Sequence, residues 1–171
     1  MLENPKEPSS LIKEQHEGLD NQQGRIAWFS GLVDGEGTIT IVCDGRGVMS
    51  TYFQVCNTSE IGLEFVSKLL TQLKIPFHIS WQKLNQKWKR VWKIRIYGFG
   101  RVRSVLNIVF PYLVIKKRQA ALTQEFISEQ FSNYFKADSV HTPRQIEIYK
   151  EVRQLNHRGP SETLCFPSSL R

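Results

Sequence analysis

The sequence has few cysteines and no long apolar run, and these two absences exclude several classes of protein. Cys43, Cys56 and Cys165 are too few and too scattered for a disulfide framework or a zinc site. No apolar segment approaches the ~20 residues that a membrane-spanning helix needs. The first residues are polar and carry both signs of charge, unlike a secretory signal. We therefore expect an intracellular protein, cytoplasmic or organellar and not secreted, with no membrane partner.

Acidic residues are also scarce where basic ones gather. Residues 81–103, WQKLNQKWKRVWKIRIYGFGRVR, interleave cations with aromatic side chains and contain no acid. A second basic run, Lys116-Lys117-Arg118, opens a later helix. The formal net charge of +7 by itself fits either a polyanionic partner or a merely soluble basic protein. The placement of the charge favours a nucleic acid.

Length and composition indicate one folded domain. The chain has 171 residues, 40% of them hydrophobic and 23% charged, which suffices for one domain with a core but is short for two. We expect a loosely held arm over residues 1–20, a single domain over residues 21–158 and a frayed tail over residues 159–171.

Hydrophobic periodicity and turn signals give an order of elements. A helix is expected from Arg25 to about Val33. An amphipathic helix with Ile61 on its apolar side begins at Ser59, which is its N-cap or lies just outside it. The other expected elements are strands at 38–43, 49–57, 77–83 and 91–97, and helices at 98–110, 115–131 and 143–155. This order, α-β-β-α-β-β-α-α-α, predicts an α+β (mixed α/β) fold with an antiparallel four-stranded sheet and additional C-terminal helices.

Alternation along the strands predicts two different sheet faces. One face is apolar and packs on helices, with Phe53, Val55, Phe77, Ile79, Trp81, Ile94 and Ile96. The other face is polar and is either simply solvated or reads DNA, since Gln, Lys and Arg make base contacts and a two-stranded β-ribbon fits the major groove. The candidate DNA-binding residues are Thr40, Ser50, Tyr52, Gln54, His78, Ser80, Gln82, Lys93 and Arg95.

The segment GRIAWFSGLVDGEGTITI, residues 24–41, is unusual for a helix end because it combines glycines with acids. On a helix, Ala27, Gly31 and Gly35 fall at i, i+4 and i+8 and form a stripe of small residues. Such a stripe allows close approach of a second backbone. Either a neighbouring helix of the same chain or a symmetry-related copy would fill it.

A second copy would bring two Glu36 carboxylates together at two negative helix ends. This arrangement is repulsive unless a cation lies between them. A hard divalent cation prefers carboxylate and carbonyl oxygens, and Mg²⁺ is the natural candidate, or another such as Mn²⁺. With phosphate oxygens and water as the remaining ligands, the pattern predicts a phosphodiesterase site.

Residues 29–37, FSGLVDGEG, resemble the signature of the LAGLIDADG homing endonucleases, with Gly31, Leu32, Asp34 and Gly37 identical. The expected α-β-β-α-β-β-α order, from about Gly24 to Phe131, is similar to the core of that family. Residues 111–120, PYLVIKKRQA, resemble the family segment that carries an active-site lysine. The resemblance implies site-specific cleavage of double-stranded DNA by hydrolysis.

The resemblance also implies roles for individual residues. Glu36 takes the place of the metal-binding acid, usually Asp, with the Gly35 carbonyl beside it. Lys116 falls on the active-site lysine, and Asn57 falls where the family often has a Gln that positions water. These three side chains, Glu36, Lys116 and Asn57, are the candidate catalytic residues.

Two further positions of the resemblance have other implications. Ile61 stands where some members carry an active-site Arg, so that contribution is missing or comes from elsewhere. Asp34 is expected to be structural, held in hydrogen bonds at the helix end.

The chain contains one copy of the motif, and family members with one copy act as homodimers. The resemblance therefore implies a homodimer on a long pseudo-palindromic target, with Ala27, Gly31 and Gly35 at the interface. The alternative is an RNA-splicing maturase or a non-catalytic DNA-binding relative of the same fold. The sequence leaves open the target, the cut stagger and the host element, intron or intein.

Overall fold

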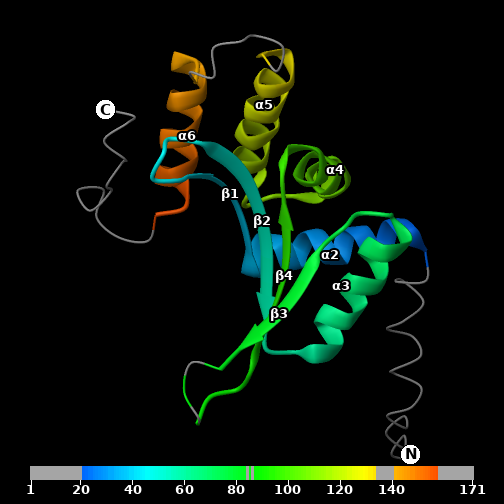
Figure 1. The fold of residues 1–171 in the computed structure, drawn as a ribbon. Helices are drawn as coiled ribbons and strands as arrows, with labels where there is room; N and C mark the ends of the chain where they lie inside the picture. Colours follow the sequence, from blue (N-terminus) through cyan, green and yellow to red (C-terminus); the bar gives the residue numbers. More distant parts are fainter. Residues whose placement is uncertain (1–20, 84, 86, 134–140, 158–171) are drawn as a thin grey trace, which may run out of the picture.

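A computed structural model describes residues 21–83, 85, 87–133 and 141–157. The expected arm and tail lie outside these residues. The helices and strands follow one another in the predicted order (Figure 1). Their bounds are α2 Gln22–Glu36, β1 Gly37–Cys43, β2 Met49–Asn57, α3 Glu60–Gln72, β3 His78–Gln82, β4 Val91–Tyr97, α4 Phe99–Val109, a 3₁₀ turn η1 Phe110–Tyr112, α5 Lys117–Asn133 and α6 Pro143–Leu155. No helix in the described ranges is long and apolar enough to cross a membrane.

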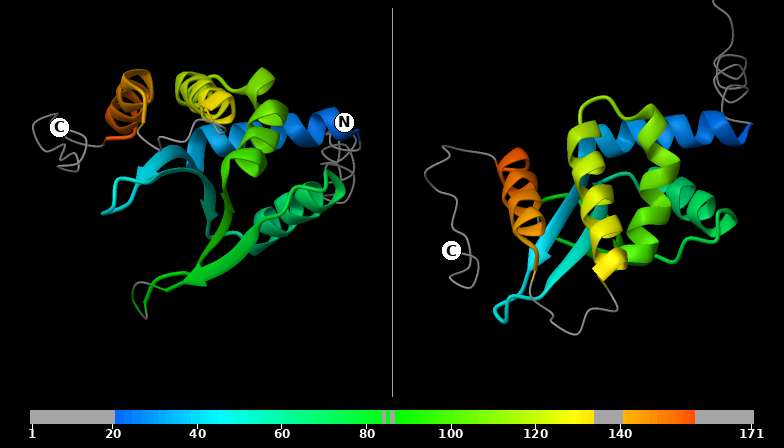
Figure 2. Two further views of the ribbon diagram at one scale, coloured as in Figure 1. Left: turned by 45° about the horizontal axis from the view of Figure 1, so that its top comes forward. Right: turned by 90° about the horizontal axis from the view of Figure 1, so that it is seen from above.

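The four strands form one antiparallel sheet in the order β1-β2-β4-β3. Each hairpin contributes one inner strand and one edge strand, so β2 and β4 are paired on both sides. The helices α2, α3 and α4 lie on one face of the twisted sheet, and α5 and α6 lie side by side near the β1–β2 hairpin (Figures 1 and 2). The order and the antiparallel pairing confirm the predicted α+β fold.

Local capping sets several helix ends. The Ser59 hydroxyl accepts a hydrogen bond from the Gly62 N–H at 3.2 Å and begins α3, as predicted. Thr142 and Gln145 form a reciprocal capping box, with Pro143 in the first turn of α6. These signals lie within a few residues of the helix ends that they fix, so the sequence located the ends well.

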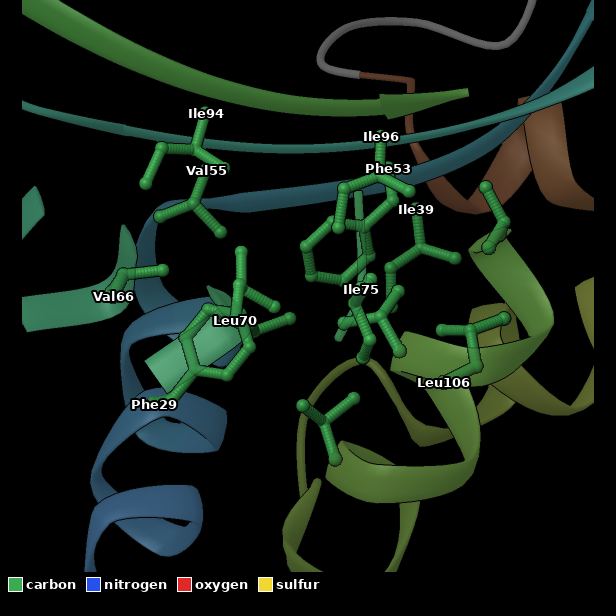
Figure 3. Close-up of a cluster of buried hydrophobic side chains, with 14 of the residues drawn as sticks. Phe29, Ile39, Phe53, Val55, Val66, Leu70, Ile75, Ile94, Ile96 and Leu106 are labelled. Carbon is green, nitrogen blue, oxygen red and sulfur yellow. The ribbon is translucent and has the colours of Figure 1, made fainter. Parts of the chain in front are cut away.

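The larger of two hydrophobic clusters lies between the sheet and the helices α2, α3 and α4 (Figure 3). Burying an aliphatic or phenyl side chain contributes about 1.5–3 kcal/mol each. In this cluster Phe29 of α2 contacts Phe53 of β2, with 6.2 Å between ring centroids. The other residues drawn and labelled in this cluster are Ile39, Val55, Val66, Leu70, Ile75, Ile94, Ile96 and Leu106. The motif helix is thus anchored on the sheet by its apolar side.

A second cluster lies under the distal part of the β1–β2 hairpin, where α5 and α6 meet it. Phe126 of this cluster packs on Phe99 with ring centroids 6.1 Å apart. The Asn156 side chain at the end of α6 donates to the Ile39 carbonyl oxygen of the edge strand β1 at 2.8 Å. The fully or nearly buried members are Ile41, Met49, Leu122, Phe126, Ile148, Tyr149 and Val152.

Three expectations about packing were wrong. The helix α2 does not end at about Val33 but runs through Gly35 to Glu36. Ile61, expected on the apolar side of its helix, is 80% exposed. The apolar side of β3 is only partly covered, because Ile79 is 42% and Trp81 53% exposed. In each case the local sequence pattern does not show how far the neighbouring elements extend in space.

Candidate metal and nucleic-acid site

The helix α2 packs only one of its sides inside the described chain. Phe29 and Val33 are buried, whereas the small-residue stripe of Ala27, Gly31 and Gly35 lies on another side, half-buried at Ala27 and exposed at both glycines. A side chain built at Gly31 or Gly35 would meet no atom within 4 Å. Among the described residues, therefore, no helix of the same chain fills the stripe at its two glycines.

The end of α2 leads into β1 without a loop. Glu36 is the last helical residue and is exposed, and Gly37 is the first residue of the strand. A Cβ at Gly37 would lie 2.9 Å from the Val33 Cα, within the backbone of the preceding turn. Glycine is therefore required at this close approach, and the junction holds Glu36 at the edge of the sheet.

Asp34 connects this helix end to a distant segment. Its Oδ2 accepts from the Val114 N–H at 2.7 Å and its Oδ1 from the Lys116 N–H at 2.9 Å. Burial raises the pKa of this carboxyl, but the backbone N–H groups of Val114, Lys116 and Ile115 outweigh it, so its pKa is lowered. Asp34 is structural, as expected, but its partners lie 80 residues away rather than in its own helix.

Lys116 is brought to the same end of α2. Its Nζ donates to the Asp34 carbonyl oxygen, two residues before Glu36. A cation near the carbonyl end of a helix is favoured by the helix dipole. The structure thus places two of the three candidate catalytic residues, Glu36 and Lys116, at one helix end.

Asn57 and Glu36 line one cavity of about 260 Å³, together with Cys56, Thr58 and Val91. The Asn57 Oδ1 accepts from the Ser59 N–H at 2.8 Å, which fixes the side chain in the turn before α3. Burial raises the pKa of the neighbouring Cys56 thiol, so its sulfur stays protonated at neutral pH. The cavity therefore combines one carboxylate, one amide and one neutral thiol.

The predicted polar sheet face exists, and among the described residues no helix packs against it. The strand pairing aligns its residues in rows across the sheet, one of which runs Thr38, Gln54, Arg95, His78. In that row the Arg95 Nε donates to the Gln54 Oε1 at 2.9 Å. All nine candidate DNA-binding residues lie on this face, at Thr40, Ser50, Tyr52, Gln54, His78, Ser80, Gln82, Lys93 and Arg95.

Solved structures with the same architecture include I-Vdi141I, "Archaeal Intron-encoded Homing Endonuclease I-Vdi141I Complexed With DNA" (TM-score 0.64, 14% identity, 82% of this chain and 89% of that one). Homing endonuclease I-CvuI on the I-CreI target has a TM-score of 0.61, 19% identity, and coverage of 87% and 91%. The group I intron-encoded homing endonuclease I-CeuI, complexed with DNA, has a TM-score of 0.60 and 14% identity, with 98% of this chain and 96% of that one covered. The chain has the LAGLIDADG endonuclease fold. No family model and no curated protein matches the sequence itself.

Within this LAGLIDADG fold, a divalent cation fits the donors of one chain only in part. The exposed Glu36 carboxylate at the end of α2 supplies hard oxygen, which suits Mg²⁺ or Mn²⁺. In the described ranges, however, no three His, Cys, Asp or Glu side chains lie close enough to hold a metal ion. A complete ligand set therefore needs oxygens besides the clustered side chains of the described residues.

Sequence reasoning missed several residues of this LAGLIDADG surface. Thr38 and Tyr97 lie on the polar face two residues from predicted members, so strict alternation would have found them. Cys56 lines the Glu36 cavity, which only the folded arrangement reveals. The side of β3–β4 turned away from the polar face carries Trp81, with the Arg90 guanidinium 4.2 Å from its ring centroid.

Proposed function

We propose that the chain is a site-specific DNA endonuclease that acts as a homodimer and hydrolyses phosphodiester bonds with a divalent metal. The observation that carries this proposal is the position of Glu36. It ends a helix whose glycine stripe is open, and it borders a polar, cationic sheet face. The solved neighbours with this fold are homing endonucleases, several in complex with DNA, which supports double-stranded DNA as substrate.

The dimer is supported by the open stripe and by the share of the solved neighbours that the chain covers. One chain supplies one Glu36, so a site with two carboxylates requires two chains related by a two-fold axis along the paired α2 helices. The chain covers 91% of I-CvuI and 96% of I-CeuI, but 44% of I-AabMI and 49% of I-SmaMI. It therefore matches about half of the longer chains and supplies one half-site.

The chain's own residues have distinct tasks in this proposal. Glu36 and the Gly35 carbonyl would hold the cation, which when bound polarises a phosphate oxygen and lowers the pKa of water. Asn57, fixed by the Ser59 N–H, orients water beside Glu36. Lys116 stabilises negative charge as a water oxygen bonds to phosphorus and a phosphorus–oxygen bond to the sugar breaks. The substrate would be intracellular or organellar DNA.

The test of metal chemistry is Glu36→Gln. A duplex bound by the wild-type protein is first selected from a randomised library in Ca²⁺, and cleavage is then measured in Mg²⁺ and Mn²⁺. The variant should bind this duplex and fail to cut it, because one metal ligand is lost and the sheet is unchanged. The control is Glu64→Gln, an exposed acid on α3 that pairs with Lys68 at 2.7 Å.

Cleavage by Glu36→Gln at the wild-type rate would contradict the metal assignment. A wild-type protein that binds the selected duplex and cuts it in neither metal would support the non-catalytic DNA-binding relative. Preferential binding to a structured RNA would support the maturase.

The test of the dimer is Gly31→Leu. Its side chain meets open space within one chain, and leucine is the better helix former by nearly 1 kcal/mol, so a monomer would be stabilised. At a close two-fold contact the same side chain must separate the helices, and overpacking costs about 1–3 kcal/mol. We expect sedimentation to shift from dimer to monomer, with loss of cleavage.

The matched control is Gly100→Leu in α4, where a side chain also meets no atom within 4 Å. This variant should stay dimeric. A wild-type protein that sediments as an active monomer would contradict the dimer and the shared metal site together.

A further inference from the structure

Arg95 occupies the middle of the polar sheet face. It lies on the inner strand β4, directly across from Gln54 on one side and His78 on the other. Its side chain is partly exposed and belongs to a face that no described helix covers. An arginine in this position approaches a bound duplex through the centre of the sheet rather than at its rim.

Gln54 holds this arginine through a defined set of hydrogen bonds. Its Oε1 accepts from the Arg95 Nε at 2.9 Å and also from the Tyr52 hydroxyl. Its Nε2 donates to the Cys56 sulfur at 3.0 Å. Because a guanidinium has donors only, the amide oxygen must face Arg95, and the orientation of the amide is determined.

The neighbouring groups keep this arrangement at neutral pH. Burial raises the pKa of the Tyr52 phenol, although the charge of Arg95 opposes the shift, so the hydroxyl stays protonated and donates. Burial likewise raises the pKa of the Cys56 thiol. Tyr52 is itself packed on Tyr97, with ring centroids 5.2 Å apart.

By residue type, either Gln54 or Arg95 could contact a base, and their hydrogen bonds distinguish the two. A glutamine that reads adenine uses its amide oxygen and its NH₂ together on the base. The Gln54 oxygen already accepts two hydrogen bonds, so the residue is poorly suited to that contact. The Arg95 Nε–H is also engaged, which leaves the terminal edge with its two parallel N–H groups.

We propose that Arg95 reads a guanine in the major groove of each half-site and that Gln54 is its positioning residue. The terminal edge of a fixed guanidinium matches the O6 and N7 acceptors of guanine. Gln54, itself held by Tyr52 and Cys56, fixes the Nε–H edge of the guanidinium, and the position of Arg95 in the middle of the face rather than at its rim favours a base over a phosphate. The inference rests on the proposed DNA-binding function and revises the expectation that Gln54 itself meets a base.

The experiment compares binding preferences rather than cleavage. Wild-type protein and variants select duplexes from a randomised library in Ca²⁺, and affinities for all four base pairs at each selected position are then measured. Wild type should require G·C at one position in each half-site. Arg95→Ala should reduce discrimination at that position by roughly 5- to 150-fold and leave the other positions unchanged. Thermal melting checks that each variant is folded.

Gln54→Met tests the positioning role, because methionine has a similar length but cannot accept the Arg95 N–H. It should relax the same base pair as Arg95→Ala, and the double variant should lose little more than Arg95→Ala alone. Gln54→Glu restores an acceptor for the Nε–H and should keep the guanine preference. Lys93→Ala, which removes the same charge from the same face, should leave this base pair unaffected.

Three results would overturn the inference. If Gln54→Met relaxes a different base pair from Arg95→Ala, Gln54 reads its own base. If Arg95→Ala lowers affinity evenly across sequences with a reduced salt slope, Arg95 is a phosphate contact. If wild type selects no sequence at all, the proposed DNA function itself fails and the inference fails with it, whereas the first two results leave that function intact.

Discussion

The two hairpins of the sheet have the same pairing but very different support. The β1–β2 hairpin is held from behind by the second hydrophobic cluster, where Ile41 is 1% and Met49 3% exposed. Its turn is tied by Asp44, whose carboxylate accepts from the backbone N–H groups of Arg46 and Val48, both at 2.9 Å. The His141 Nε2 lies 2.9 Å from the Gly47 carbonyl oxygen of the same turn.

The β3–β4 hairpin is backed by α3 and α4 at Ile94 and Ile96, but its turn end lacks such a backing in the described ranges. Trp81 and Trp88 are 53% and 60% exposed. The Arg90 guanidinium lies 4.2 Å from the ring centroid of Trp81 and 5.6 Å from that of Trp92. This stacking within the hairpin replaces the helix packing that its counterpart has.

The difference suggests that one hairpin contributes mainly to stability and the other mainly to binding. The turn end of β1–β2 is supported by buried packing, whereas positive charge and exposed aromatic side chains are concentrated at the turn end of β3–β4. Substitutions in the first region should therefore change the free energy of unfolding, and substitutions in the second should change DNA affinity. Three predictions test this division.

The largest effect is expected for Phe126→Ala in the second cluster. Phe126 is fully buried, and truncation of such a residue costs about 3–5 kcal/mol in unfolding free energy. Urea denaturation measures it. Trp81→Ala, an aromatic truncation on the exposed hairpin, should cost far less, and an equal cost would contradict the comparison. Phe131→Ala, on the same helix but 44% exposed, is the control for α5 itself.

An intermediate effect is expected for Asp34→Asn, which loosens the anchor where β1 and α5 begin. The backbone N–H groups of Val114 and Lys116 bond different oxygens of Asp34, and asparagine replaces one of these oxygens by an NH₂ donor that cannot accept. We therefore expect a loss of about 1–3 kcal/mol at neutral pH. Because the pKa of Asp34 is lowered in the folded state, the ionised carboxylate stabilises the fold above its ordinary value near 3.9. That contribution decreases as pH falls through the lower folded value.

Denaturation of wild type and Asp34→Asn from neutral to acidic pH measures this difference, which should narrow at the acidic end. A constant difference would contradict the carboxylate mechanism. Asp44→Asn, at a more exposed turn with similar backbone contacts, should give a smaller loss.

The smallest effect on stability is expected for Arg90→Gln. Its stacking on Trp81 is exposed and contributes less than about 1 kcal/mol. If the proposed DNA function holds and Arg90 contacts phosphate, the salt slope of DNA affinity should fall by about one unit. Arg46→Gln, on the other hairpin tip and paired with Asp44 at 3.0 Å, should change the slope less. If the two variants change the salt slope of DNA affinity equally, the two hairpins do not differ in their contribution to DNA binding.

Most of the fold could be predicted because its signals are local. Alternation gave the bounds of β2 and β4, and the Pro143 signal gave those of α6. Packing between distant segments could not be predicted in this way. The sequence near Ile39 does not indicate that the Asn156 side chain donates to the Ile39 carbonyl oxygen. The sequence near Ile61 likewise does not indicate that this side chain is exposed.

The candidate site divides in the same way. The motif gave Glu36 and the open stripe, because both depend on one helix. The partners of Asp34 and the contacts of Gln54 depend on strands and loops far away in sequence. Residue type alone therefore suggested a base contact for Gln54, and the positioning role proposed above needed the folded structure.

The direct junction of α2 and β1 at Gly37 fixes the orientation of the helix relative to the sheet. No loop separates the helix from the strand, so the two elements cannot reorient independently of each other. In the proposed complex, the helix would pair with its copy and the sheet would lie on DNA. In the proposed dimer the crossing of the two helices therefore sets the angle and the separation of the two sheets. Such a dimer would hold its two half-sites at a fixed separation, so a base pair inserted between the half-sites should prevent both sheets from binding at once.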